Sequence, residues 1–214
     1  MKKLFLPLAA IGLNVISPIT NAMVEDPLVL RLRWLVVSPD DHSNEISLIN
    51  GTASVSTNIT PEFDISYFFT DNLAAELITA YTRHQVKANG TVLGNLNLGE
   101  VSLLPPTLTL QWHFMPNCLI DPYLGSGINY TIFYGVDSGP IAQHIEYENS
   151  FGGVIQAGLN FNFTDHWHIN LDVKKVWIDT DVTVRTNSNS VVDLKTSVDI
   201  DPWIFGLGIG YRFG

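Results

Sequence analysis

The 214-residue sequence is short of charge and of cysteine. Charged residues make up 15% of it and hydrophobic residues 46%, whereas soluble globular domains usually have about 25% charged residues. An ordinary cytoplasmic protein is therefore a poor fit, and the hydrophobic content excludes a disordered chain. The single cysteine, Cys118, cannot form an intramolecular disulfide, so the fold does not rest on a disulfide framework.

Basic residues are also scarce. Lys and Arg number 11 against 21 Asp and Glu, which gives a formal net charge of −10. Binding to phosphate backbones needs clustered Lys and Arg, and the sequence has no basic stripe. We therefore expect no nucleic-acid partner.

Long hydrophobic runs are confined to the N-terminal end. Lys2 and Lys3 precede an apolar stretch from Leu4 to about Ile16, and Thr20-Asn21-Ala22 supplies small residues for cleavage. This pattern is typical of a secretory signal peptide, so we expect a signal peptide at residues 1–22 and a mature domain at 23–214. No later run approaches the roughly 20 apolar residues of a membrane helix.

Patterns that indicate catalysis or metal binding are absent as well. No G-x-S-x-G motif occurs. His166 and His168 would share one face of a strand, but no cysteine or third ligand has zinc-site spacing. We therefore expect no enzyme, no catalytic residue, no metal and no cofactor.

What the sequence does have is alternation of apolar and polar side chains with period 2, the pattern of strands with two different faces. In the last such segment, Trp203, Phe205 and Leu207 share a face that is opposed by Gly206 and Gly208. The segments span residues 28–36, 59–69, 73–86, 107–114, 125–134, 155–163, 167–174 and 202–213. The sequence thus predicts eight strands.

The connections between these strands alternate in length. Short turns at 70–72, 115–121 and 164–166 alternate with long polar stretches near 38–56, 88–100, 135–149 and 182–195, which we expect to be loops. Short turns at one rim and long loops at the other are typical of an outer-membrane barrel with both termini in the periplasm. The sequence therefore predicts an all-β fold, an eight-stranded antiparallel transmembrane β-barrel.

The chemistry of the two faces argues against the alternative, a soluble lipocalin-like barrel. Such a barrel has an apolar interior and a polar exterior. Here the wide, aromatic-rich faces hold almost no charge, and the opposite faces hold the small and charged residues. The aromatic residues expected in the interfacial girdles are Trp34, Trp112, Trp167, Trp203 and Tyr211.

The inward faces of the predicted strands carry charges of both signs. An eight-stranded barrel is only just wide enough to be filled by side chains, so these charges can either close the bore as an ion-pair network or line a pathway as a gate. Inward glycines likewise either leave room for a permeant molecule or allow close packing. The predicted lumen-lining residues are Arg31, Arg33, Glu62, Asp64, Glu76, Gln111, Asn129, Gln156, Asp172, Lys174 and Arg212.

A hydrophobic substrate would need an apolar site away from these charges. We expect that site in the outer half of the barrel and its long loops, with a route that leaves sideways through the wall into lipid. The candidate residues are Leu48, Ile49, Val92, Leu93, Leu96, Leu98, Phe133 and Val136.

Several short motifs follow one another in a characteristic order. They are Phe69-Thr70-Asp71-Asn72 followed by Ala75-Glu76-Leu77, Leu104-Pro105-Pro106-Thr107-Leu108, the ten residues 122–131 (PYLGSGINYT), Gln156-Ala157-Gly158, and Asp201-Pro202-Trp203 leading to Gly210-Tyr211-Arg212-Phe213. Through their order and spacing, the mature chain resembles the outer membrane protein W (OmpW) family over essentially its whole length.

The resemblance implies a narrow outer-membrane channel in a Gram-negative bacterium, associated with small hydrophobic compounds and stress responses, and without catalytic residues. We therefore expect passive passage of small, mainly hydrophobic molecules. The alternative is a closed structural or surface-interaction barrel whose extracellular loops bind an external partner. Expected partners are outer-membrane lipid, lipopolysaccharide and small hydrophobic molecules, and the oligomeric state stays open.

Overall fold

The computed structural model describes residues 24, 26–40, 42–43, 52–91, 94–138, 144–185 and 193–214. All of its regular elements are β-strands. No helix in these ranges is long and apolar enough to cross a membrane. The predicted signal peptide, residues 1–22, lies outside the described residues and stays a prediction.

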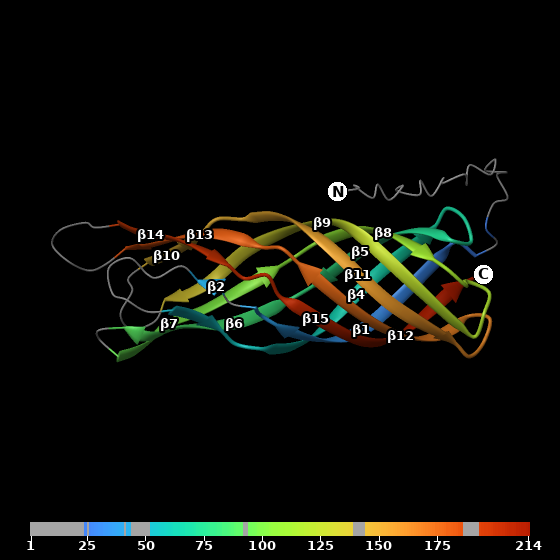
Figure 1. Cartoon of the computed structure of the whole chain (residues 1–214), viewed down its shortest axis with the longest axis horizontal. Helices are drawn as coiled ribbons and strands as arrows, with labels where there is room; N and C mark the ends of the chain where they lie inside the picture. The colour runs from blue at the N-terminus through green and yellow to red at the C-terminus, as the bar shows by residue number, and fades with distance from the viewer. Residues whose placement is uncertain are drawn as a thin grey trace, which may run out of the picture.

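Eight strands form a closed antiparallel barrel, which confirms the predicted fold class. Each barrel strand pairs with the next barrel strand along the chain, and the last pairs with the first (Figure 1). Leu28 stands opposite Phe213 at this closing seam. The barrel strands are β1 (Leu28–Ser38), β4 (Asn58–Phe68), β5 (Leu73–Ala80), β8 (Thr107–His113), β9 (Ile120–Ser138), β11 (Ser150–Asn162), β12 (Trp167–Val176) and β15 (Trp203–Phe213).

Three short turns, at residues 69–72, 114–119 and 163–166, join barrel strands at the rim where β15 ends, which we call the turn rim (Figure 1). Two of them contain a threonine that fixes the chain reversal. The Thr70 hydroxyl accepts hydrogen bonds from the backbone N–H groups of Asn72 and Leu73. Thr164 does the same for His166 and Trp167. These threonine turns explain why the connections are so short.

At the opposite rim, the hairpin rim, strands continue beyond the barrel (Figure 1). The sequence predicts loops at 88–100, 135–149 and 182–195, and this prediction is wrong over much of each stretch. The additional strands are β2 (His42–Ser43), β3 (Thr52–Val55), β6 (Thr82–Thr91), β7 (Gly94–Leu104), β10 (His144–Tyr147), β13 (Asp179–Arg185) and β14 (Asp193–Asp199). Valine and threonine are frequent in them, and β-branched residues favour strands even where one face is not buried in a core.

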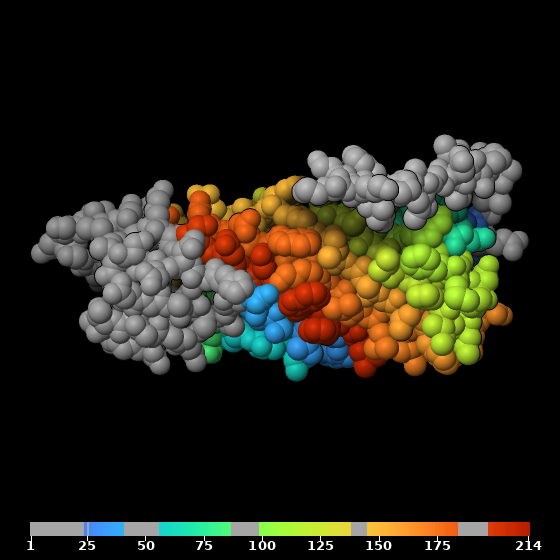
Figure 2. Space-filling model, viewed as in Figure 1, coloured from blue at the N-terminus to red at the C-terminus, as the bar shows by residue number. Residues whose placement is uncertain are grey.

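The outward faces of the barrel strands form an apolar belt. On β15, Trp203, Phe205 and Leu207 are 43 to 55% exposed, whereas the alternate position Gly206 is buried. Figure 2 shows one side of this wall, where side chains of β1, β12 and β15 lie side by side. In such a barrel the outward side chains face the lipid. Hydrogen bonds between neighbouring strands pair the backbone N–H and C=O groups.

One hairpin at the hairpin rim should respond to pH. Asp179 of β13 stands directly opposite Asp199 of β14. Partial desolvation and the carboxylates of Asp199 and Asp201 raise the pKa of Asp179. A carboxyl whose pKa is higher in the folded hairpin favours that hairpin when protonated, so this stabilisation is lost as pH rises through the folded-state pKa.

We therefore expect amide hydrogens of β13 and β14, corrected for intrinsic exchange rates, to be better protected when Asp179 is protonated at acidic pH than at pH 7. An Asp199→Asn variant should have the higher protection already at pH 7, because the repulsion is gone. Asp137→Asn, which removes a carboxylate paired with Arg83 instead, is the control. Equal protection in the two variants would contradict the assignment.

Candidate functional site

The inner face of the barrel is polar in its turn-rim half. Ten of the eleven predicted lumen-lining residues are no more than 6% exposed, and Arg212 is half-buried. They come from different strands: Arg31 and Arg33 from β1, Glu62 and Asp64 from β4, Glu76 from β5, Gln111 from β8, Asn129 from β9, Gln156 from β11, and Asp172 and Lys174 from β12.

Arg33 is the centre of this polar interior. Its side chain is 0% exposed. The guanidinium lies 2.7 Å from Glu62, 2.7 Å from Asp64 and 2.6 Å from Glu76, and 3.7 Å from Asp172 across the lumen. A buried charge of this kind is tolerated only when it is paired and hydrogen-bonded.

Two further cations complete the network. Arg31 lies 2.9 Å from Asp64 and 3.4 Å from Glu76. Lys174 lies 3.2 Å from Glu62 and 2.5 Å from Asp172. We call these seven residues the plug: Arg31, Arg33, Lys174, Glu62, Asp64, Glu76 and Asp172. These ion pairs join β12 to β1 and β4 through the bore.

Neutral side chains supply the remaining hydrogen bonds of the plug. Gln111 and Gln156 donate to Glu76 at 2.7 and 2.9 Å. The Tyr123 hydroxyl donates to Asp172 at 2.7 Å and accepts from Asn170 at 3.1 Å. Sequence reasoning missed the role of Tyr123, although its odd-numbered position places it on the same face as the inward glycines of β9.

The inward glycines make room for the plug. A Cβ at Gly208 would lie 2.5 Å from Arg33 Cγ, and one at Gly210 would lie 2.6 Å from Arg31 Cγ. At Gly158 a Cβ would meet the Tyr123 ring at 2.3 Å. Of the two interpretations of the glycines, the structure favours close packing, since large side chains occupy the space beside them.

Toward the hairpin rim the inner face gains apolar side chains, which lie beside buried threonines such as Thr60 and Thr82. Leu35, Val154, Val176 and Ile178 are 2 to 5% exposed and belong to inward clusters. Ile204 of β15 packs against both clusters. Sequence reasoning expected an apolar site in the outer half of the barrel but named none of these residues. The signal of this apolar layer is the loss of alternation in short runs such as residues 35–37 and 176–178, where both faces are apolar.

The candidate apolar residues are only partly placed. Phe133 packs against the cluster of Val154, Val176 and Ile178, and Val136 is half-buried on β9. Leu96 and Leu98 lie on β7, but their side chains are outside the described part of the chain. The candidates wholly outside the described residues are Leu48, Ile49, Val92 and Leu93.

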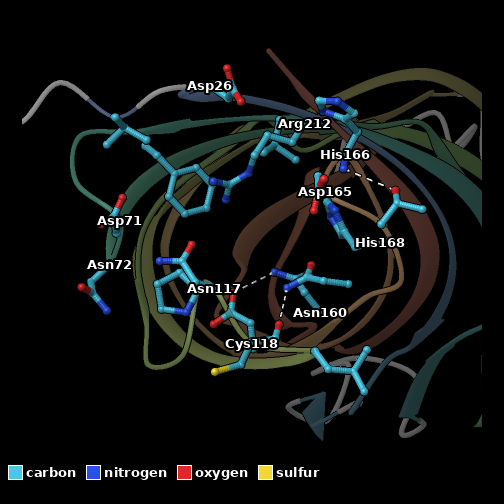
Figure 3. Close-up of a pocket in the computed structure, with 18 of the residues that line it drawn as sticks. Asp26, Asp71, Asn72, Asn117, Cys118, Asn160, Asp165, His166, His168 and Arg212 are labelled. Atoms are coloured by element: carbon cyan, nitrogen blue, oxygen red, sulfur yellow. Dashed lines mark hydrogen bonds between the residues drawn. The ribbon is translucent and has the colours of Figure 1, made fainter.

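A cavity of about 1070 Å³ opens at the turn rim, which we call the vestibule (Figure 3). Arg212 lies there, with its guanidinium 4.4 Å from the Phe68 ring, and does not belong to the plug. The plug therefore has three cations and four carboxylates. His166 and His168 also line the vestibule. Within the described ranges, no three His, Cys, Asp or Glu side chains form a metal site.

The strand pairing of the barrel wall is interrupted beside the apolar layer. The pairing of β5 with β8 ends at Ile78 opposite Thr107, and pairing resumes between β6 and β7 at Thr82 opposite Leu103. Residues 79–81 and 104–106 lie between these pairs, and Pro105 and Pro106 have no N–H to donate. On the other side β9 stays attached, since Tyr130 N–H donates to the Pro106 carbonyl at 3.0 Å.

Comparison with known proteins places this geometry among outer-membrane barrels. The model of the OmpW family matches residues 25–213. An outer-membrane protein of Sinorhizobium fredii, y4mB, is 37% identical over 200 residues, covering 92% of this chain and 86% of its own. Outer membrane protein W of Vibrio cholerae is 29% identical over 214 residues, covering 94% of this chain and 97% of its own.

A solved structure has the same architecture. The crystal structure of OprG from Pseudomonas aeruginosa superposes with a TM-score of 0.81 at 29% identity, covering 88% of this chain and 96% of that one. Since its relatives are outer-membrane proteins, this barrel lies in the outer membrane. The turn rim then faces the periplasm and the hairpin rim faces outward.

Proposed function

Because the chain belongs to the OmpW family of outer-membrane barrels, we propose that it passes small hydrophobic molecules from the cell exterior into the membrane. One observation supports this proposal: the inner face has two apolar clusters in the outer half of the barrel, and the buried ion pairs of the plug lie below them. A hydrophobic molecule can contact apolar side chains in the hairpin-rim half, whereas passage through the turn-rim half would require separating buried ion pairs. The route therefore leaves sideways.

The interruption at Pro105 and Pro106 supports the place of exit. Ile78, Ala80 and Leu103, which flank it, are 3, 8 and 7% exposed. A hydrophobic molecule that passes here moves from apolar side chains to lipid. Little of its apolar surface meets water, and each Å² that did would cost about 25 cal/mol. Few backbone hydrogen bonds have to break, because two prolines already lack donors.

This function needs no cofactor, no catalytic residue and no nucleic-acid partner. Its proposed partners are small hydrophobic molecules, together with outer-membrane lipid and lipopolysaccharide around the belt. Either a single barrel or an association of barrels can perform it.

A cross-link over the interruption tests the route. The register on both sides places Tyr81 opposite Leu104, so a Tyr81→Cys/Leu104→Cys pair, in a Cys118→Ser background, can be oxidised to join the two edges. Cellular uptake of N-phenyl-1-naphthylamine should slow at least fivefold on oxidation and recover with dithiothreitol.

The matched control is Leu110→Cys/Ser126→Cys, two exposed positions paired in an uninterrupted part of the wall. Its oxidation should leave uptake unchanged. Equal uptake in the oxidised and reduced forms of the first pair would overturn the sideways route. If removal of the whole protein also left uptake unchanged, a closed surface-interaction barrel would be the better explanation.

A further inference from the structure

The vestibule contains basic groups that the plug does not use. Several polar side chains lining it are already engaged. Asp121 accepts from His113 at 2.6 Å and from Asn160 at 3.3 Å, and Asn162 donates to the Cys118 carbonyl at 2.8 Å. Arg31 is held by Asp64 and Ser66.

Three basic side chains differ from these. Among the described residues, Arg212 has no carboxylate within ion-pair distance, and its guanidinium rests on the Phe68 ring. His168 is 6% exposed and its Nε2 has no hydrogen-bond partner in that part of the chain. The Nδ1 of His166 is likewise buried and unpartnered there.

The sheet register brings these three groups together. The Arg212 N–H donates to the His166 carbonyl, and His168 stands opposite Gly210, the inward residue next to Arg212 on β15. All three side chains line the vestibule (Figure 3). A guanidinium with two imidazoles and, among the described residues, no carboxylate within ion-pair distance is a donor set suited to an oxyanion.

We propose that the vestibule binds an organic carboxylate with an apolar body, taken up from the periplasm, through Arg212 with His166 and His168. The apolar body would rest on the wall formed by Phe68, Val29 and Val24. A cavity of about 1070 Å³ holds such a molecule. Because the plug separates the vestibule from the apolar layer, this site is independent of the proposed route.

A single negative charge fits the site better than a multiply charged phosphate. Asp26, Asp71 and Asp165 also line the vestibule as carboxylates that are exposed or half-buried. Their potential opposes a dianion more strongly than a monoanion, whereas the planar guanidinium matches both oxygens of a carboxylate.

The test uses the mature chain in phosphatidylcholine nanodiscs, with NMR signals of labelled arginine and histidine side chains as the readout. Benzoate should shift the Arg212 and His168 signals saturably. Its neutral isostere benzamide, and inorganic phosphate, should bind at least tenfold more weakly. Arg212→Gln should weaken benzoate binding at least tenfold, and the matched surface variant Arg83→Gln should not.

His168→Phe, which keeps the ring but removes both nitrogens, should weaken benzoate binding severalfold. If Arg212→Gln fails to fold, Arg212→Lys replaces it, because lysine keeps the positive charge but lacks the planar guanidinium group. Unchanged benzoate binding in a folded Arg212 variant would overturn the site, as would equal binding of benzamide or the absence of saturable shifts in the parent.

Discussion

An Arg33→Leu variant should lose about 3–5 kcal/mol of folding free energy, since it removes one partner of several buried ion pairs. Glu62, Asp64 and Glu76 each lie within 2.7 Å of this guanidinium. Without it, Arg31 and Lys174 face four buried carboxylates. Leucine fills much of the volume but donates no hydrogen bond, so the carboxylates stay desolvated and unpaired.

Urea titration of the refolded barrel in detergent, followed by tryptophan fluorescence, measures this loss. The control is Arg83→Leu, an arginine that is 47% exposed and pairs with Glu100 and Asp137 at the hairpin rim. Exposed pairs contribute about 0–1 kcal/mol. In a planar bilayer, the parent should be silent and folded Arg33→Leu should conduct cations, because the bore gains net negative charge. Equal destabilisation by the two variants would show that the plug is not the structural centre of the barrel.

Gly208→Ala should destabilise the barrel by roughly 3 kcal/mol, at the upper end of what overpacking usually costs. A Cβ there would lie 2.3 Å from the Leu32 carbonyl oxygen and 2.7 Å from Arg33 Cα. Both are backbone atoms of the neighbouring strand, so relief requires β1 and β15 to separate at the seam that closes the barrel.

The matched control lies two residues away on the same face. A Cβ at Gly206 would meet only side-chain atoms, Leu35 Cδ2 at 3.2 Å and Arg33 Cδ at 3.4 Å. Gly206→Ala should therefore cost about 1 kcal/mol or less, since flexible chain ends can move. Midpoints of urea unfolding for the two variants decide the matter, and a Gly206→Ala effect as large as that of Gly208→Ala would contradict this explanation.

The barrel could be predicted from sequence because lipid on one side and a polar bore on the other impose the same alternation on every strand. β15 is the clearest case, with large apolar residues at the odd positions and glycines at Gly206, Gly208 and Gly210. The same parity identifies inward charges such as Arg31 and Arg33. The parity of a residue cannot identify its ion-pair partner. The strands that face each other across the bore are set by the shear and closure of the barrel.

The residues of the apolar layer escaped prediction for a related reason. Where Leu35 and Val176 face inward next to apolar outward neighbours, alternation disappears and the sequence no longer distinguishes lumen from lipid. Arg212 shows another limit. It has the inward parity of the plug residues, yet it lies in the vestibule, because parity gives the face of a residue and not its depth along the bore.

The plug joins near and distant parts of the chain, which bears on the order in which its ion pairs can form. The pairs of β1 with β4 join near neighbours in sequence, such as Arg31 and Asp64, which are 33 residues apart. Contacts with β12 join distant parts of the chain: Lys174 and Glu62 are 112 residues apart, and Arg33 and Asn170 are 137 apart. Short chain closures form faster than long ones. The first hairpin can therefore bury part of its charge early, and the last carboxylate, Asp172, is neutralised only when the C-terminal strands arrive, so completion of the ion-pair network coincides with completion of the membrane-inserted barrel.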